Sequence, residues 1–413
     1  RVVENTAECK ALAEYTKCTK TAANATARTT CDQTYKNKDA DGNGYPLDCS
    51  GWNMTAKSAP GSSVWGDNDA RDLNGHGTHV AGVVAARSDD GDGVSGIAQN
   101  VRILGVKVIS ASPTEPVRPT SLNATAGAGA ALPSPDEASL KAGKGFGDLV
   151  ARGLLYAIRS KAQIINMSLG WPADVDSNLL AQLLDLARTQ GILVVAAAGN
   201  DGTDALIRPC IYTGVICVGS HDPDGALSHF SNHGPGVDVA APGLGILSLF
   251  PTALTPTVFT DRMGYEMKSG TSMASPAVVG VLARLLNAGA SAKEAYARLL
   301  LGTRPLSPNP RLARSSTSFI QTGAVDLARS LEVQPQPVIM PVAKRAVDVR
   351  WNRRDSKVSV NLELENIWTD AEKSTVEFRL LGRSALDAGL SPARVDLGRW
   401  SNGESKSLPL TLE

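Results

Sequence analysis

The chain has 413 residues, an apolar content of 42%, and 41 basic against 41 acidic side chains. This neutral balance argues against a nucleic acid or an acidic membrane surface as a partner. No apolar run reaches the length of a membrane span, and the chain is long enough for a large core and more than one domain.

The polar N-terminal segment contains four cysteines, and none of the six cysteines of the chain has paired CxxC metal spacing. Four cysteines allow three pairings, among which we favour Cys9–Cys18 and Cys31–Cys49. Further along, Cys210 and Cys217 bracket a short loop and predict a third disulfide. Disulfides would imply an exported protein, secreted or held at the cell envelope, and free buried thiols are the alternative.

A short acidic segment follows the first cysteines. Asp39, Asp41 and Asn43 place oxygen ligands at alternate positions and Gly44 comes sixth, as at the start of a calcium loop. The twelfth position is Ser50, where an EF-hand needs Glu, so an ordinary Asx-rich turn is the favoured interpretation. A structural calcium ion held by these three residues stays open as the alternative.

The segment Asn74-Gly-His-Gly-Thr-His-Val-Ala-Gly82 is the first with a catalytic pattern. Gly75 and Gly77 expose the backbone around His76, and the small residues that follow predict a helix. A histidine at a helix start suits a general base, because its ordinary pKa lies near neutrality. A zinc site at His76 and His79 is disfavoured because no third ligand is near in the sequence.

The middle of the chain alternates apolar strands with helical patterns. This rhythm is typical of an α/β protein with a mostly parallel sheet covered by helices on both faces. Residues 111–143 are rich in Ala, Gly, Pro, Ser and Thr and predict a flexible insertion. The predicted strands span 101–109, 164–167, 192–198, 215–218 and 237–240, and the predicted helices span 148–159 and 178–190, the second with Leu179, Leu180, Leu183 and Leu186 toward the core.

Two further segments complete the pattern. The apolar strand 192–198 runs into Gly199-Asn200. Asn200 is either a turn residue or, through its side-chain amide, a donor to an oxyanion.

In Gly270-Thr-Ser-Met-Ala-Ser-Pro276, the proline and the apolar residues after it predict the start of a helix. Ser272 would then lie in the first turn, where free N–H groups favour negative charge. As a nucleophile there, it could use its own N–H to stabilise an oxyanion.

Together these segments closely resemble the subtilisin-like serine proteases (subtilases), from about Asp39 to Leu331. The resemblance implies that His76 is the catalytic base, Ser272 the nucleophile and Asn200 the oxyanion-hole residue. It also implies that Ser168, Leu169 and Gly170 line the pocket for the residue before the scissile bond. The stretch Gly143–Gly147, centred on Gly145, would form the facing substrate-binding strand. Serine catalysis requires no cofactor, and an inhibitory propeptide is expected upstream.

The catalytic Asp of the family has no match in this sequence. A subtilase carries it at the end of an apolar strand before the His, but the aspartates before His76 all lie in polar sequence: Asp32, Asp39, Asp41, Asp48, Asp67, Asp69 and Asp72. The acid is therefore expected upstream of residue 1. Without it the chain would be a strongly impaired catalyst, slower by roughly 3 × 10⁴, a value known from a subtilisin.

A Pro-rich linker at 333–341 separates the peptidase domain, 1–332, from a C-terminal domain at 342–413. The pattern there changes to period-two alternation, which predicts part of a β-sandwich. We expect a serine endopeptidase acting on proteins or peptides. The alternatives are a pseudoprotease that only binds peptides and an adhesin-like structural protein acting through its C-terminal strands.

Overall fold

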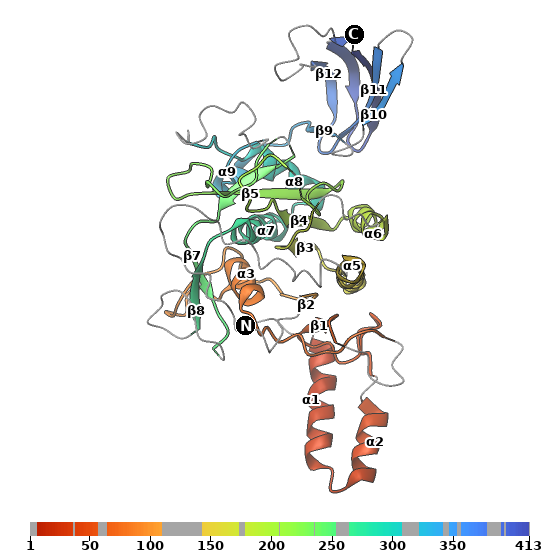
Figure 1. Cartoon of the computed structure of the whole chain (residues 1–413), viewed down its shortest axis with the longest axis vertical. Coiled ribbons are helices and arrows are strands. Elements are labelled where there is room, and N and C mark those ends of the chain that lie inside the picture. Colours follow the sequence, from red (N-terminus) through yellow and green to blue (C-terminus); the bar gives the residue numbers. More distant parts are fainter. Residues whose placement is uncertain are drawn as a thin grey trace.

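A computed structural model of the chain shows a central sheet with helices on both faces, a helical hairpin at one end and a β-rich region at the other (Figure 1). The described residues are 6–35, 38–56, 64–109, 143–172, 178–205, 207–234, 236–252, 264–307, 322–341, 347–352, 357–377, 390–391 and 394–412. The predicted insertion at 111–143 lies almost wholly outside them. Within them, no helix combines the length and apolarity that crossing a membrane requires.

The central sheet has four parallel strands in the order β3-β4-β5-β6. This confirms the predicted α/β class. Every second residue of a strand faces the same side, and the apolar residues of β4 accordingly divide between two cores. The strands span Ile164–Met167 (β3), Leu193–Ala197 (β4), Val215–His221 (β5) and Val239–Pro242 (β6).

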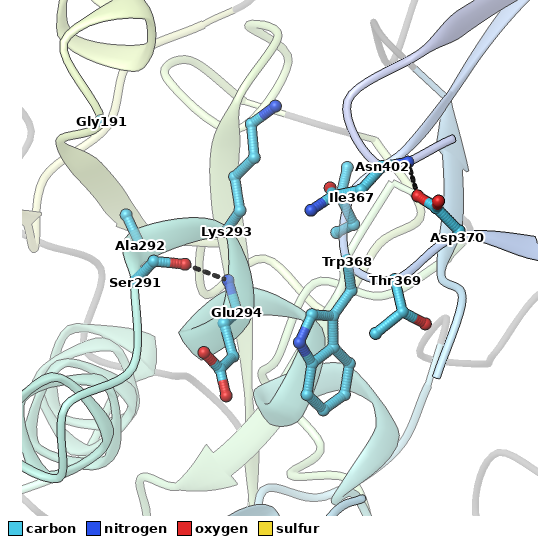
Figure 2. Close-up of a pocket in the computed structure, with 10 residues that line it drawn as sticks. All are labelled: Gly191, Ser291, Ala292, Lys293, Glu294, Ile367, Trp368, Thr369, Asp370 and Asn402. Atoms are coloured by element: carbon cyan, nitrogen blue, oxygen red, sulfur yellow. Dashed lines mark hydrogen bonds between the residues drawn. The ribbon is translucent and has the colours of Figure 1, made fainter. Parts of the chain in front are cut away.

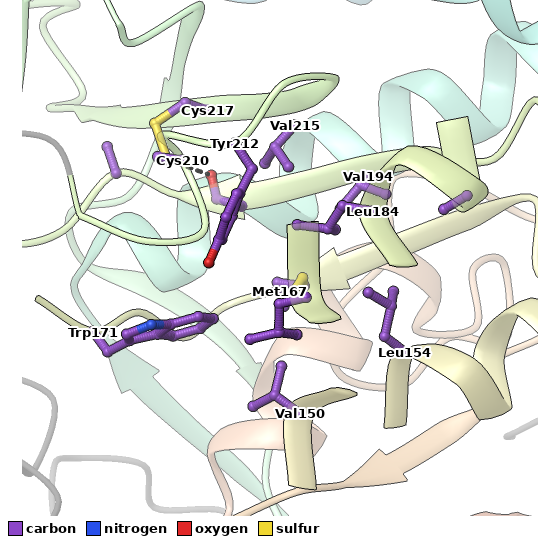
Figure 3. Close-up of a cluster of buried hydrophobic side chains, with 14 of the residues drawn as sticks. Val150, Leu154, Met167, Trp171, Leu184, Val194, Cys210, Tyr212, Val215 and Cys217 are labelled. Atoms are coloured by element: carbon purple, nitrogen blue, oxygen red, sulfur yellow. Dashed lines mark hydrogen bonds between the residues drawn. A yellow bond between two sulfur atoms is a disulfide. The ribbon is translucent and has the colours of Figure 1, made fainter. Parts of the chain in front are cut away.

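Helices α5, Gly143–Arg159, and α6, Asn178–Thr189, cover one face of the sheet. Figure 3 shows their side chains meeting the sheet beside the disulfide Cys210–Cys217. The core face of α6 differs from the prediction. Leu180, Leu184 and Ala187, spaced four and three residues apart, are buried, whereas Leu179 and Leu186 are exposed.

The opposite face of the sheet is covered by α7, Thr271–Asn287, and α8, Ala292–Leu301. α7 is apolar on nearly every side and is buried over most of its length, as expected for a helix inside a large core. Gly280 allows a close approach, because a Cβ there would lie 2.6 Å from Ile97. Helix α3, His76–Ala85, packs against α7, and the short helix α9, Leu327–Glu332, packs against α8.

Two smaller pairs of strands border the helices. The parallel pair β1, Gly51–Asn53, and β2, Gly105–Lys107, covers only three residues of the strand predicted at 101–109. The antiparallel hairpin of β7, Ile246–Leu249, and β8, Tyr265–Lys268, packs on α3 and leads directly into α7. The hairpin therefore connects the helix that carries His76 with the helix that carries Ser272.

The N-terminal segment forms a helical hairpin that the sequence analysis did not predict, α1 (Thr6–Thr21) and α2 (Ala25–Tyr35). It projects from the body of the molecule (Figure 1). The disulfides join Cys9 to Cys49 and Cys18 to Cys31, so the favoured pairing of these four cysteines was wrong. Cys9 and Cys18 lie on one helix, nine residues or roughly 13 Å apart along its axis, and cannot bond. Cys210–Cys217 agrees with the prediction.

The C-terminal region consists of antiparallel strands, of which β11, β12, β14 and β15 lie on the predicted alternating segments. The strands form a five-stranded sheet (β9, β10, β11, β13 and β15) and a two-stranded sheet (β12 and β14). The two sheets share a core of Leu364, Ala371, Trp400 and Leu408. Assignment to a β-sandwich domain stays a prediction. The strands span Ile339–Pro341 (β9), Val347–Asn352 (β10), Lys357–Asn366 (β11), Ala371–Glu377 (β12), Leu390–Ser391 (β13), Arg394–Trp400 (β14) and Ser405–Leu412 (β15).

The end of the predicted linker takes part in this region, because β9 pairs with β11 and Val338 is buried. Val338 packs with Ile367, Trp368 and Ala297 of α8, which joins the C-terminal strands to the peptidase core. A cleft of about 690 Å³ opens beside this junction, between Lys293 and Trp368 (Figure 2). None of the predicted catalytic residues lines it.

Candidate active site

Ser272 lies at the second position of α7, one turn after β8 ends. Gly270 makes this turn at φ 151°, a backbone conformation that favours glycine. Ser272 is buried, and its Oγ donates a long hydrogen bond of 3.4 Å to the backbone oxygen of Ser168. Its N–H meets no acceptor among the described residues. The hydroxyl and the free N–H thus both lie at the positive end of a helix dipole.

Asn200 follows the central strand β4 and is fixed against the same helix start. Its Oδ1 accepts the Thr271 N–H at 2.8 Å and the Thr271 hydroxyl at 2.9 Å. With the oxygen engaged in this way, the Nδ2 end of the amide is left as the donor. Asn200 and the Ser272 N–H are therefore brought together at one helix terminus, as an oxyanion site requires.

Asn232 holds the loop that carries Asn200, a role that the sequence analysis did not assign. Its Nδ2 donates to Ala198 O at 3.0 Å, and its Oδ1 accepts the N–H groups of Asp201 and Thr203. A Cβ on Gly199, where φ is 105°, would lie 2.4 Å from Asn232 Nδ2. No local pattern around Asn232 indicated this role, because the N–H groups that it accepts lie 31 and 29 residues away in the chain.

His76 is the first residue of α3. Its Nε2 is buried and has no hydrogen-bond partner within the described part of the chain. Burial, followed by the positive charges of Lys268 and His79, lowers the pKa of His76 to about 4. The ring is therefore neutral at pH 7, and one of its two nitrogens carries a lone pair. No hydrogen bond joins it to Ser272 here, and catalytic contacts of this kind often close only when substrate binds.

Asp72 is the nearest aspartate to His76 in the sequence, but its oxygens serve the helix start. They accept the N–H groups of Asn74, Gly75 and Thr78 and the Thr78 hydroxyl, at 2.7 to 2.9 Å. Burial alone would raise the pKa of Asp72. The hydrogen bonds to the carboxylate have the larger combined effect, so its pKa is lowered from the ordinary value. Across the described residues, no carboxylate hydrogen-bonds to either ring nitrogen of His76.

Ser168 supports the nucleophile from below. Its Oγ donates to the backbone oxygen of Ser272 at 2.8 Å and lies 3.1 Å from Ser275 Oγ, within hydrogen-bond distance. Gly170 lies close to Ile207, because a Cβ added to Gly170 would lie 2.4 Å from the Ile207 side chain. Contact of Ser168, Leu169 and Gly170 with substrate stays a prediction.

Gly145 lies in the first turn of α5, so the strand predicted over Gly143–Gly147 is wrong, and contact of Gly145 with substrate stays a prediction. The helix begins five residues before the predicted position 148. The pattern of α5 continues through Val150, Leu154 and Ile158, all buried at helical spacing. A strand beside Ser168 is therefore not supplied by this segment.

The residues proposed for calcium are placed in a turn. Asp39 accepts the N–H groups of Gly42 and Gly44, and Asp41 accepts that of Asn43. Asn43 donates to the buried Asp48 at 2.8 Å. Among the described residues, His, Cys, Asp and Glu form no group of three or more that could hold a metal. Calcium binding there stays a prediction.

A serine at a helix start, a fixed amide beside it and a neutral histidine on the neighbouring helix define a serine hydrolase of the subtilisin type. Comparison with known proteins supports this class. Residues 53–305 match the model of the subtilase family. The chain therefore belongs to the subtilase family of serine peptidases.

Individual relatives agree. The chain is 35% identical to an intracellular serine protease of Paenibacillus polymyxa over 67% of this chain and 75% of the relative. It is 37% identical to a thermophilic serine proteinase of Bacillus sp. (strain AK1), over 54% of this chain and only 45% of that protein. A solved structure of a protease from Pseudoalteromonas arctica PAMC 21717 shares 27% identity with a TM-score of 0.50, covering 68% of this chain and 82% of that one.

Proposed function

We propose that this protein is a serine endopeptidase in which Ser272 is the nucleophile, His76 the general base and Asn200 an oxyanion donor. The observation that carries the proposal is the start of α7, where Asn200 is bonded to Thr271 directly beside the buried Ser272. A binding protein would need neither a free N–H at Ser272 nor an unpaired imidazole nitrogen at His76.

The chemistry is acyl transfer. Ser272 Oγ attacks the peptide carbonyl carbon while His76 Nε2 takes its proton, and the carbonyl oxygen becomes an oxyanion held by Ser272 N–H and Asn200 Nδ2. His76 then gives the proton to the leaving amine and the C–N bond breaks. Water repeats the sequence on the acyl-enzyme, which releases the acid product and restores the hydroxyl.

The acid of the triad is proposed to come from a segment upstream of residue 1. Support for this is that no described carboxylate bonds to His76, although an imidazolium must be stabilised during the reaction. An inhibitory propeptide would lie upstream of the segment that carries this acid. Protein or peptide substrates fit the family. Export fits the three disulfides, which oxidising compartments favour.

A fluorophosphonate probe on the full-length product tests this function. We expect one label, on Ser272, that is lost in Ser272→Ala. Asn200→Asp keeps an oxygen for Thr271 but removes the amide donor, and should slow labelling about 100- to 1000-fold, as for the corresponding donor in a subtilisin. Melting temperature serves as the folding control. Peptide binding with no labelling at all would identify a pseudoprotease instead.

A further inference from the structure

The first turn of α7 contains a backbone oxygen that its own helix cannot pair in the usual way. In an α-helix the carbonyl oxygen of residue i accepts the N–H of residue i+4. For Ser272 that residue is Pro276, which lies inside α7 and has no N–H. Ser272 is only 1% exposed, so water has little access to its carbonyl. A buried carbonyl oxygen left without any donor would destabilise this turn.

A side chain at the end of β3 supplies a donor to this oxygen. Ser168, the residue after β3, donates from its Oγ to Ser272 O at 2.8 Å, although the two residues lie 104 positions apart in the chain. In the opposite direction, Ser272 Oγ donates to Ser168 O at 3.4 Å. Ser168 therefore contacts both the backbone and the hydroxyl of the proposed nucleophile.

Two neighbouring side chains fix the direction of the bond from Ser168. Asn166 Nδ2 donates to Ser168 Oγ at 2.9 Å, and Ser275 Oγ donates to Asn166 Oδ1 at 2.6 Å. A serine hydroxyl has a single hydrogen to donate. Because Ser275 uses its hydrogen for Asn166, Ser168 keeps its own hydrogen for Ser272 O. Ser275 and Ser168 are both buried, so this network is shielded from competing water.

We propose that the Ser168 hydroxyl takes the place of the N–H that Pro276 lacks, and so fixes the helix turn that carries Ser272. Ser168 is thus a positioning residue that acts through the backbone of the nucleophile, a role separate from the predicted contact with substrate. For catalysis, this inference rests on the proposed function. A shift of this turn would move the attacking Oγ and the oxyanion-binding N–H together, because both belong to Ser272.

The test combines Ser168→Ala with Pro276→Ala in the full-length protein. Ser168→Ala removes the donor and should lower the maximal rate of fluorophosphonate labelling about 10-fold, since a shift of a whole ångström can cost about 100-fold. The probe concentration for half-maximal rate should not change. Alanine at 276 supplies the usual helical N–H, so the double variant should recover most of the lost rate. A folded double variant as slow as Ser168→Ala would overturn the proposal.

Ser330→Ala is the matched control. Ser330 is fully buried, and its Oγ also donates to a backbone oxygen, that of Asp326, at 2.7 Å. It lies in α9, which carries no candidate catalytic residue. This variant should be labelled at the wild-type rate. Equal slowing in Ser330→Ala and Ser168→Ala would identify a general loss of stability and contradict the positioning role.

The double variant also covers a failure of Ser168→Ala to fold. With an N–H restored to residue 276, Ser272 O again has a donor, so the double variant should fold. If it stays unfolded as well, the hydroxyl of Ser168 does not stand in for the missing N–H.

Urea unfolding separates this inference from the proposed function. Pro276→Ala should be more favourable for stability in the Ser168→Ala background than in wild type, because only there does Ser272 O lack a donor. If this coupling appears but wild type is never labelled, the proposed function fails and the replacement bond stands. If wild type is labelled and the two substitutions are coupled in neither rate nor stability, only the role of Ser168 is wrong.

Discussion

Gly75 and Gly77 flank His76, and the structure gives them different roles. Gly75 has φ 94°, a left-handed conformation, and its missing Cβ leaves room for the Phe250 ring. Gly77 lies within α3, is exposed, and its nearest contact for a Cβ is Asp72 Oδ2 at 3.6 Å. The first glycine is required by both backbone and packing, and the second by neither.

We therefore expect opposite effects of two alanine substitutions. Gly75→Ala should lower the free energy of unfolding by at least about 2 kcal/mol, because it adds strain and a clash. Gly77→Ala should leave it unchanged or raise it by up to about 1 kcal/mol, because alanine favours the helix. Urea unfolding of both variants measures this, and equal losses of stability would refute the assignment.

The α1–α2 hairpin shows how an element can depend on covalent bonds more than on a core. Among the residues of its two helices with described exposure, Ala11 and Cys31 are the buried ones. Cys18–Cys31 joins α1 to α2, and Cys9–Cys49 joins α1 to the segment before β1. Because neither helix has an apolar stripe, the residue pattern indicates these helices only weakly.

The two bonds can be identified by peptide mapping. Trypsin sites place the four cysteines on separate peptides, which end at Lys10, Lys20, Lys36 and Lys57. We expect nonreduced digests to contain the peptide of Cys9 joined to that of Cys49, and the peptide of Cys18 joined to that of Cys31. Reduction should separate them. A Cys9–Cys18 linked peptide would instead support the sequence-based pairing.

Across the whole molecule, one junction connects the catalytic body to the C-terminal strands. Trp368 is 7% exposed and packs with Val338 and Ala297, and the guanidinium of Arg298 lies 5.3 Å from its ring centre. Lys293 of α8 adds an ion pair with Glu365 of β11. None of these groups belongs to the candidate active site.

Trp368→Ala should therefore loosen the junction and spare catalysis. Losing a large buried aromatic ring costs about 3–5 kcal/mol when the site cannot collapse. We expect faster limited proteolysis within residues 333–341 and an unchanged rate of Ser272 labelling by fluorophosphonate. Wild-type resistance to proteolysis would show that Trp368 does not hold the two parts together.

Much of the active site could be predicted from local sequence. Glycines and small residues at His76, Asn200 and Ser272 mark the points where strands and helices begin or end, and the order of the segments matched a family. Local sequence could not decide whether the segment around Gly145 is a strand or a helix. A glycine-rich segment has no clear periodicity, and the helix α5 begins inside this one.

By itself, the sequence determined the α/β class and the three side chains that we assign to catalysis, because periodicity and turn residues act over a few neighbouring positions. Tertiary structure alone decided which cysteines bond, that Asn232 holds the loop of Asn200, and that His79 of α3 bonds to the β7–β8 hairpin. Those relationships join residues many positions apart, and their proximity follows from packing that no local pattern encodes.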